Sequence, residues 1–152
     1  MIRLSKLFSW SNAICYDGGH VINEYIMTLD MSTVADDRYQ TIAYDRLRWW
    51  IANVLTNSVM IAHDCEFLSA YQNTPQRVLV VPSDPVDHLV SMLLYLKLNA
   101  IMESRLIIDE IKLSSEQGDH MCYLHSNYTD QIEFDTRGWW VDSGPGYENR
   151  EC

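Results

Sequence analysis

Long apolar runs are absent from this 152-residue sequence, and their absence limits where the chain could work. No run reaches the roughly 18 apolar residues that a membrane-spanning helix needs. The first residues, 1–12, carry charge and short polar side chains and lack the apolar core of a secretory signal. We therefore expect a soluble protein that spans no membrane and works in the cytoplasm.

Basic residues and cysteine motifs are also scarce. Only 11 lysines and arginines stand against 21 aspartates and glutamates, and the net charge of −10 disfavours direct binding to nucleic acid, because few cations could release counterions. The four cysteines show no C-x-x-C spacing, which favours reduced thiols over a disulfide framework. An acidic surface could engage a basic partner, although a solubilising charge is the simpler interpretation.

What the sequence does have is enough apolar residues, 47%, to bury the core of one domain. Its clearest patterns lie in residues 77–126. Val78-Leu-Val-Val is typical of a short buried strand, and apolar residues at helical spacing predict a helix over residues 86–102, with Ser83 as its cap and Pro85 in its first turn. A period of two then predicts a strand over 107–113, a turn at Gly118-Asp119 and a returning strand over 121–125.

The N-terminal half predicts a long hairpin followed by a helix. Residues 2–14 suit a strand with one wet face, Asp17-Gly-Gly marks a tight turn, and residues 20–31 alternate as a second strand. Ile22 and Ile26 make the outer face of that strand partly apolar, which suggests cover by another subunit or a ligand. An apolar stripe predicts a helix over 42–61, and residues 62–76 are expected to form an irregular connection that has room for one more helical turn.

These elements predict an α+β fold in which an antiparallel sheet carries two helices on one face, in the order ββα-βαββ. No internal repeat or low-complexity tract is visible. We expect a single domain over residues 1–126. Residues 127–152 are rich in turn formers and are expected to form a C-terminal extension. Its Trp139 and Trp140 fold back on the chain as a lid or dock into a partner.

The element order and several short segments resemble the tunnelling fold of pyruvoyl- and carboxytetrahydropterin synthases. Cys15-Tyr-Asp-Gly-Gly-His20 stands where that family has a cysteine before a His-x-His pair, and Pro82-Ser-Asp-Pro85 stands at its Pro-Thr-x-Glu helix opening. Residues 111–123 correspond to the strands that end in its ligand-binding Glu and Tyr. The resemblance covers residues 7–125 and implies an oligomer that binds a purine- or pterin-like heterocycle at subunit interfaces.

Several positions depart from the family pattern. Its three zinc-binding histidines correspond to Gly18, His20 and approximately Asn12, and its Asp-His pair corresponds to Asn57-Ser58. Catalytic zinc needs about three protein ligands, so no metal and no cofactor are expected. The resemblance then implies ligand binding by His20, Ser115 and Glu116 without the family's chemistry.

Three functions therefore remain open. The leading hypothesis is a non-enzymatic homo-oligomer that binds a small planar heterocycle or a protein partner at its subunit interfaces. The second is an active pterin- or deazapurine-pathway lyase with a rearranged site, in which Cys15 is the nucleophile and His20 lowers its pKa. The third is an acidic inhibitor that covers a basic surface of a partner.

Overall fold

The computed structural model describes residues 1–16, 18–33, 38–126 and 140. The elements follow in this order: β1 (Ile2–Tyr16), β2 (Gly19–Thr33), α1 (Arg38–Trp50), the π-helical turn η1 (Ile51–Leu55), β3 (Val59–Ala62), α2 (Leu68–Gln72), β4 (Val78–Val81), α3 (Asp87–Met102), β5 (Ile107–Ser115) and β6 (Tyr123–Ser126). None of the helices within these ranges is long and apolar enough to cross a membrane.

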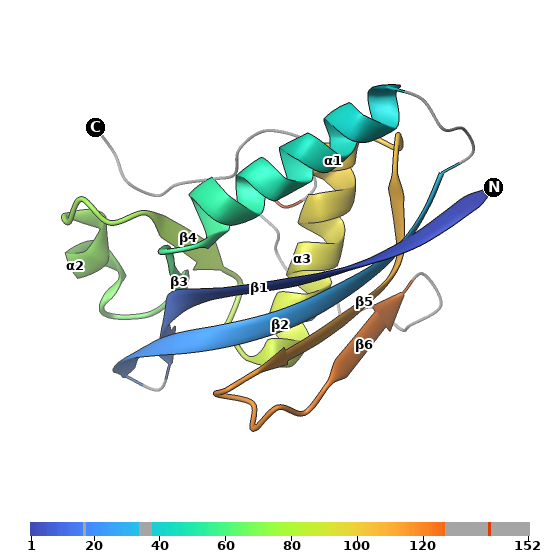
Figure 1. The fold of residues 1–152 in the computed structure, drawn as a ribbon. Helices are drawn as coiled ribbons and strands as arrows, with labels where there is room; N and C mark the ends of the chain where they lie inside the picture. The colour runs from blue at the N-terminus through green and yellow to red at the C-terminus, as the bar shows by residue number, and fades with distance from the viewer. Residues whose placement is uncertain (17, 34–37, 127–139, 141–152) are drawn as a thin grey trace.

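The strands form one six-stranded sheet in the order β4-β3-β1-β2-β5-β6 (Figure 1). Antiparallel pairing joins β1, β2, β5 and β6, and the long β1–β2 hairpin turns at Gly18, whose φ of 76° favours glycine. Two short strands, β3 and β4, add in parallel beside the end of β1. The predicted α+β class is confirmed, and the sheet is mixed because of these two strands.

Helices α1 and α3 cover one face of the sheet, which we call the inner face (Figure 1). Alternate residues of β2 point into the core there, as the period of two predicts, and Tyr25, Met27 and Leu29 are each at most 1% exposed. Helix α3 buries most of its circumference, including the whole of Lys97. The main core therefore lies between the inner face and these two helices.

The opposite, outer face is only partly covered. Near β3 and β4, Cys15 and Ile61 belong to a second apolar cluster, against which Leu68 and Tyr71 of α2 pack. Over the middle of the sheet, the exposed apolar side chains are Leu7, Ile22, Ile26 and Leu124. The outer face thus combines a small covered core with an open apolar region.

Two local predictions are wrong. The helix expected over 42–61 ends in the π-helical turn, and its last residues form strand β3. The further helical turn allowed within the connection over 62–76 is the short helix α2. Ser83 does not cap α3, because that helix begins at Asp87 after Val86, which gives no side-chain cap.

Candidate functional site

A buried carboxylate stands where the first turn of α3 meets the end of β5. Asp87 is 6% exposed, and both of its carboxylate oxygens lie 2.7 Å from the Oγ of Ser115. The Ser115 Oγ also accepts a hydrogen bond of 3.1 Å from the backbone N–H of Gly118. A single hydroxyl has one proton to donate, so most of the acceptor positions of the carboxylate are not filled by Ser115.

Gly118 lets the β5–β6 turn approach this carboxylate closely. A Cβ at position 118 would lie 2.2 Å from the Oδ2 of Asp87 and 3.0 Å from its Cγ. No side chain fits that space unless Asp87 moves. Gly118 is therefore required by this close approach. Its backbone conformation is an ordinary one and does not itself require glycine.

Strand β2 adds two buried polar side chains to the cluster. Tyr25 is paired with Ser115 across the β2–β5 ladder, and Asn23 accepts a 2.9 Å hydrogen bond from the backbone N–H of Gln117. The Nδ2 of Asn23 and the OH of Tyr25 are buried, and beyond their contact with each other neither has a hydrogen-bond partner among the described residues. Buried polar atoms are nearly always satisfied by protein groups or ordered water, so these two groups leave hydrogen-bonding capacity in the site.

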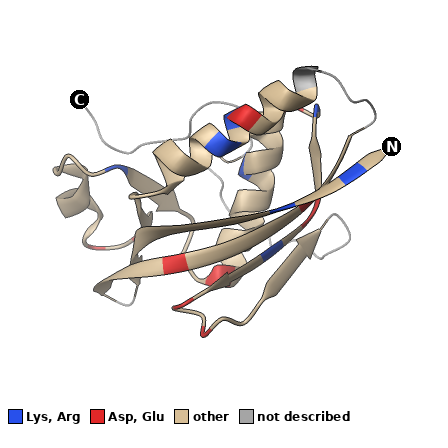
Figure 2. Ribbon diagram, viewed as in Figure 1, with Lys and Arg blue, Asp and Glu red and all other residues tan. Residues whose placement is uncertain are grey.

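The electrostatics of this site favour neutral ligands that carry hydrogen-bond donors. Burial raises the pKa of Asp87, and hydrogen bonds from Ser115 lower it in part. Burial likewise raises the pKa of Tyr25, a side-chain hydrogen bond with Asn23 lowers it in part, and the charge of Asp87 raises it further. Acidic residues mark the nearby β5–β6 turn, and the turn sequence, residues 116–122, contains no lysine or arginine (Figure 2).

A cavity of about 410 Å³ lies at the same part of the hairpin, and of the cluster residues Tyr25 alone lines it. Its lining comes from both hairpin strands and the β5–β6 turn: Ser9, Trp10, Ser11, Glu24, Tyr25, Ile26 and His120. The rings of Trp10 and Tyr25 stack with centroids 5.1 Å apart, which holds the phenol in place. We take Asn23, Tyr25, Asp87 and Ser115 as the candidate site.

A second buried polar side chain, His125 of β6, packs against α3. The ring of His125 is 2% exposed and meets the ring of Tyr95 edge-on at 4.9 Å, and its Nδ1 has no hydrogen-bond partner among the described residues. Burial lowers the pKa of His125, and the charge of His88 lowers it further. This lowered pKa favours the neutral form of the imidazole.

The structure brings only one of the three ligand residues expected from the family resemblance into the site. Ser115 is central to it. Glu116 lies next in the chain but is exposed in the turn, with its backbone N–H bonded to the carbonyl of Glu24. His20 lies on the outer face, where its Nδ1 is 2.6 Å from the OH of Tyr71.

The alternative catalytic pair lies outside the site. Cys15 and His20 are cross-strand neighbours at the end of the hairpin. However, burial raises the pKa of Cys15 to about 11, with further contributions from the hydrogen bond and charge of Cys65. A nucleophilic cysteine needs a lowered pKa, so this environment opposes the lyase mechanism.

No cluster of three or more metal-binding side chains occurs within the described ranges. Asn12, at the position of one zinc ligand in the resembled family, accepts a 2.8 Å hydrogen bond from the indole of Trp10 and donates to the carbonyl of Ala13. Its side chain is thus committed within its own strand.

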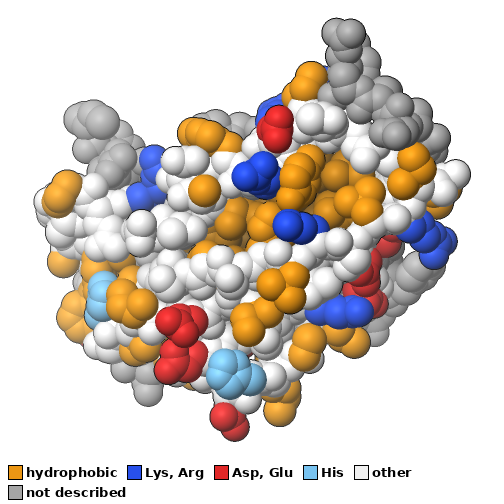
Figure 3. All heavy atoms as spheres, viewed as in Figure 1, with side chains coloured by type: hydrophobic (Ala, Val, Ile, Leu, Met, Phe, Trp, Pro, Cys, Tyr) orange, Lys and Arg blue, Asp and Glu red, His pale blue; other side chains and the backbone are white. Residues whose placement is uncertain are grey.

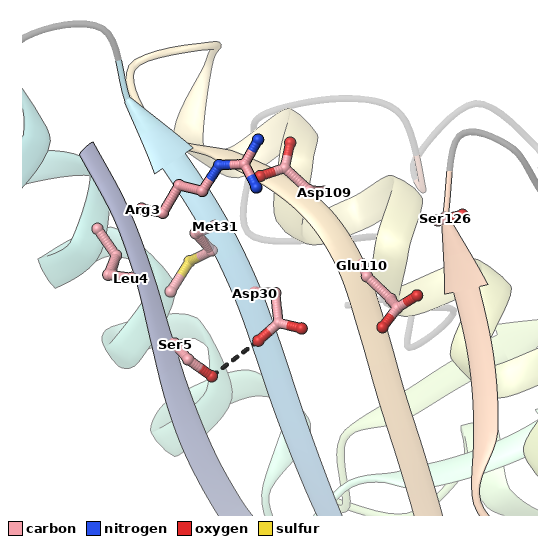
Figure 4. A pocket seen from close by; sticks show the side chains of 8 residues that line it. All are labelled: Arg3, Leu4, Ser5, Asp30, Met31, Asp109, Glu110 and Ser126. Carbon is pink, nitrogen blue, oxygen red and sulfur yellow. Dashed lines mark hydrogen bonds between the residues drawn. The ribbon is translucent and has the colours of Figure 1, made fainter. Parts of the chain in front are cut away.

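Another cavity, of about 520 Å³, opens at the opposite end of the hairpin (Figure 4). Asp30, Asp109 and Glu110 line it, and Asp30 accepts a 2.8 Å hydrogen bond from Ser5. Lys112 lies 3.5 Å from Asp30 and 3.8 Å from Glu110, so part of the negative charge is compensated. These are surface contacts, which contribute little to stability.

Of the two C-terminal tryptophans, the structure describes Trp140. Trp140 is fully buried and belongs to the main core, a placement in keeping with a lid on this chain. Its indole is therefore not presented to a partner in this conformation. Trp139 lies outside the described residues.

Sequence reasoning missed the buried carboxylate of the site. Asp87 lies two residues after the segment that resembles the family's helix opening, which was the available signal. Asn23 and Tyr25 read as ordinary members of an amphipathic strand. Only the tertiary fold shows that Asp87 and Tyr25 meet Ser115 and that Asn23 binds the turn that follows it.

Comparisons with known proteins provide a structural neighbour but no family. No family model matches the sequence, and no curated protein matches it either. The fold is similar to the crystal structure of an uncharacterized protein, WS1659, from Wolinella succinogenes, with a TM-score of 0.60 and 9% identity. The match covers 83% of this chain and 98% of that one, and it supports the α+β fold alone.

Proposed function

We propose that this protein is a non-enzymatic, oligomeric binding protein that takes a small planar heterocycle of the purine or pterin kind at the Asp87 site. The observation that carries the proposal is the set of unused hydrogen-bonding positions in one buried place. Asp87 offers acceptors, while Asn23 and Tyr25 offer donors that have no described partner beyond each other. The tunnelling-fold resemblance supports the same ligand class.

The chemistry of the site restricts the ligand further. A carboxylate accepts hydrogen bonds from N–H groups, and a flat heterocycle presents several such groups along one edge. The amide of Asn23 and the phenol of Tyr25 would donate to ring nitrogens or carbonyl oxygens. Glu24, Glu116 and Asp119 lie near the β5–β6 turn, so we expect neutral or cationic ligands to bind better than phosphorylated ones.

A homo-oligomer is the second part of the proposal. β1 pairs with β3 only through Ala13–Cys15, so residues 2–11 leave one backbone edge without a partner strand in the described sheet. At the other end of the antiparallel section, β6 is also an edge. Two different edges that pair between copies make a head-to-tail contact, and such contacts form a ring when the rotation between copies closes.

Apolar surface beside the first edge supports the assembly. Leu4 and Phe8 of β1 and Tyr44 of α1 are only partly buried against the main core. Figure 3 displays apolar side chains gathered in a hollow between α1 and β1. Exposed apolar areas of this kind commonly mark protein interfaces. The same surface would also suit a different protein as partner. Light scattering of the pure protein distinguishes the two cases, because only self-association raises the measured mass above that of one chain.

A thermal-shift and calorimetric screen tests the binding function. Guanine-like and pterin-like heterocycles are compared with their phosphorylated forms, and a ligand at 100 times its Kd should stabilise the protein by about 2.7 kcal/mol. Asp87→Asn removes the negative acceptor and should weaken binding by at least tenfold. Asp45→Asn, an exposed change on α1, is the matched control and should bind normally.

Absence of any stabilising heterocycle in this screen, with the protein folded, contradicts the proposal and favours the acidic-inhibitor hypothesis. Equal binding by wild type and Asp87→Asn would instead show that the ligand binds at a different site.

A further inference from the structure

Two thiols that are distant in sequence meet at the covered end of the outer face. The Sγ of Cys15, on β1, lies 3.9 Å from the Sγ of Cys65, in the turn between β3 and α2. Both are reduced in this structure. The parallel pairing of β1 with β3, in which Cys15 stands opposite Ile61, brings this turn over the strand.

The local structure holds Cys65 over its neighbour. Its backbone N–H donates to the carbonyl of Ala62 at 3.1 Å, and its own carbonyl accepts from Leu68 at 3.1 Å. Cys15 is 4% exposed, whereas Cys65 is only partly buried. One thiol is therefore reachable from solvent and the other lies directly beneath it.

We propose that Cys15 and Cys65 form a reversible intramolecular disulfide by exchange with low-molecular-weight disulfides. An S–S bond measures about 2.05 Å, so the two sulfurs must approach by about 1.9 Å. Rotation of the Cys65 side chain and a small shift of its turn provide this movement. Cys122, which is exposed, has no such thiol neighbour among the described residues.

The exchange proceeds in two balanced steps. The Cys65 thiolate attacks one sulfur of a glutathione disulfide, which forms a mixed disulfide and releases one glutathione thiolate. Cys15 then gives up its proton and attacks the Cys65 sulfur, which forms the internal disulfide and releases the second glutathione. The two protein thiols are oxidised, and one glutathione disulfide is reduced to two glutathione molecules.

The exposure and the acidity of the two thiols decide which one attacks first. Burial raises the pKa of Cys15, which keeps it protonated and makes it a poor first nucleophile. Its nearness to Cys65 makes the second, intramolecular step favourable. The product ties the β3–α2 turn to β1, next to the contact between His20 and Tyr71. A cross-link between residues 15 and 65 also restrains the unfolded chain.

The full-length protein, equilibrated with reduced or oxidised glutathione, tests the proposal. Free thiols counted in denaturant should fall from four to two under oxidising conditions, and peptide mapping should recover the Cys15 and Cys65 peptides joined. Cys65→Ser should abolish the joined peptides. Cys122→Ser, the matched control, should keep them. The oxidised wild type should also unfold at a higher urea concentration than the reduced form.

Persistence of only a mixed glutathione disulfide on Cys65, or joined peptides that contain Cys122 or Cys152 in place of Cys15, would overturn the proposal. Unchanged thiol counts under oxidising conditions would do so as well. Cys65 is less buried than Cys15, which makes Cys65→Ser the safer variant, so the outcome does not depend on whether a change at the buried Cys15 folds.

Discussion

Substitution of Gly118 by alanine tests the close packing around Asp87. The added methyl would stand 2.2 Å from the Oδ2 of Asp87 and 3.4 Å from the Oγ of Ser115. The carboxylate must therefore leave its position and lose its hydrogen bond with Ser115. Over-packing costs about 1–3 kcal/mol, and a hydrogen bond to a charged group contributes about 1.5–3 kcal/mol.

We expect the Gly118→Ala variant to lose about 2 kcal/mol of unfolding free energy in urea denaturation, a value within both of these ranges. The matched control is Gly19→Ala, because a methyl at that position meets only the carbonyl of Tyr16, at an ordinary 3.5 Å. That variant should change stability by less than about 0.5 kcal/mol.

A double-mutant cycle isolates the contact. In the Asp87→Ala background the carboxylate is gone, so Gly118→Ala should cost clearly less than in the wild type, since residues in direct contact are not additive. An equal cost in both backgrounds would refute the idea that Gly118 is required by Asp87.

Four further predictions follow from the same structure. Because the native pKa of Asp87 is raised, the wild type should lose stability relative to Asp87→Asn as pH rises from about 3.8 upward in urea titrations, and a reversed slope would contradict the assigned burial. The native pKa of His125 is lowered, so its stabilising contribution should be complete above pH 6.5 and decline below it, and His125→Gln should remove that dependence. Trp140→Ala should cost about 3–5 kcal/mol in thermal or urea unfolding, whereas an indole packed outside the core would cost little. Elemental analysis should find far less than one zinc per chain, and stoichiometric zinc that is lost in His20→Ala would revive the lyase hypothesis.

The hairpin, α3 and β5 could be predicted because their burial follows local periodicity. Tyr25, Met27 and Leu29 alternate on one strand face, and that face is the buried one. The apolar run of β3, Val59–Ala62, could not be separated from the end of α1, since no proline or glycine stands between them and a short apolar run fits either structure. The π-helical turn that ends the helix likewise contains no proline or glycine that would predict it.

The candidate site was predictable only in part. Ser115 was found through its position in the family resemblance. Asp87 lies 28 residues away from it in sequence, and their hydrogen bond depends on how α3 packs on β5. Likewise, the 3.9 Å approach of Cys15 and Cys65 depends on the parallel placement of β3, which the sequence did not predict.

A crystal structure of the assembled protein, grown with the tightest heterocycle from the screen, tests the central claim most directly. We predict a planar ligand whose N–H edge lies within about 3.2 Å of the Asp87 carboxylate, with Asn23 Nδ2 and Tyr25 OH as donors to it. Ordered water alone bridging these three groups, with the heterocycle absent or bound elsewhere, would contradict it.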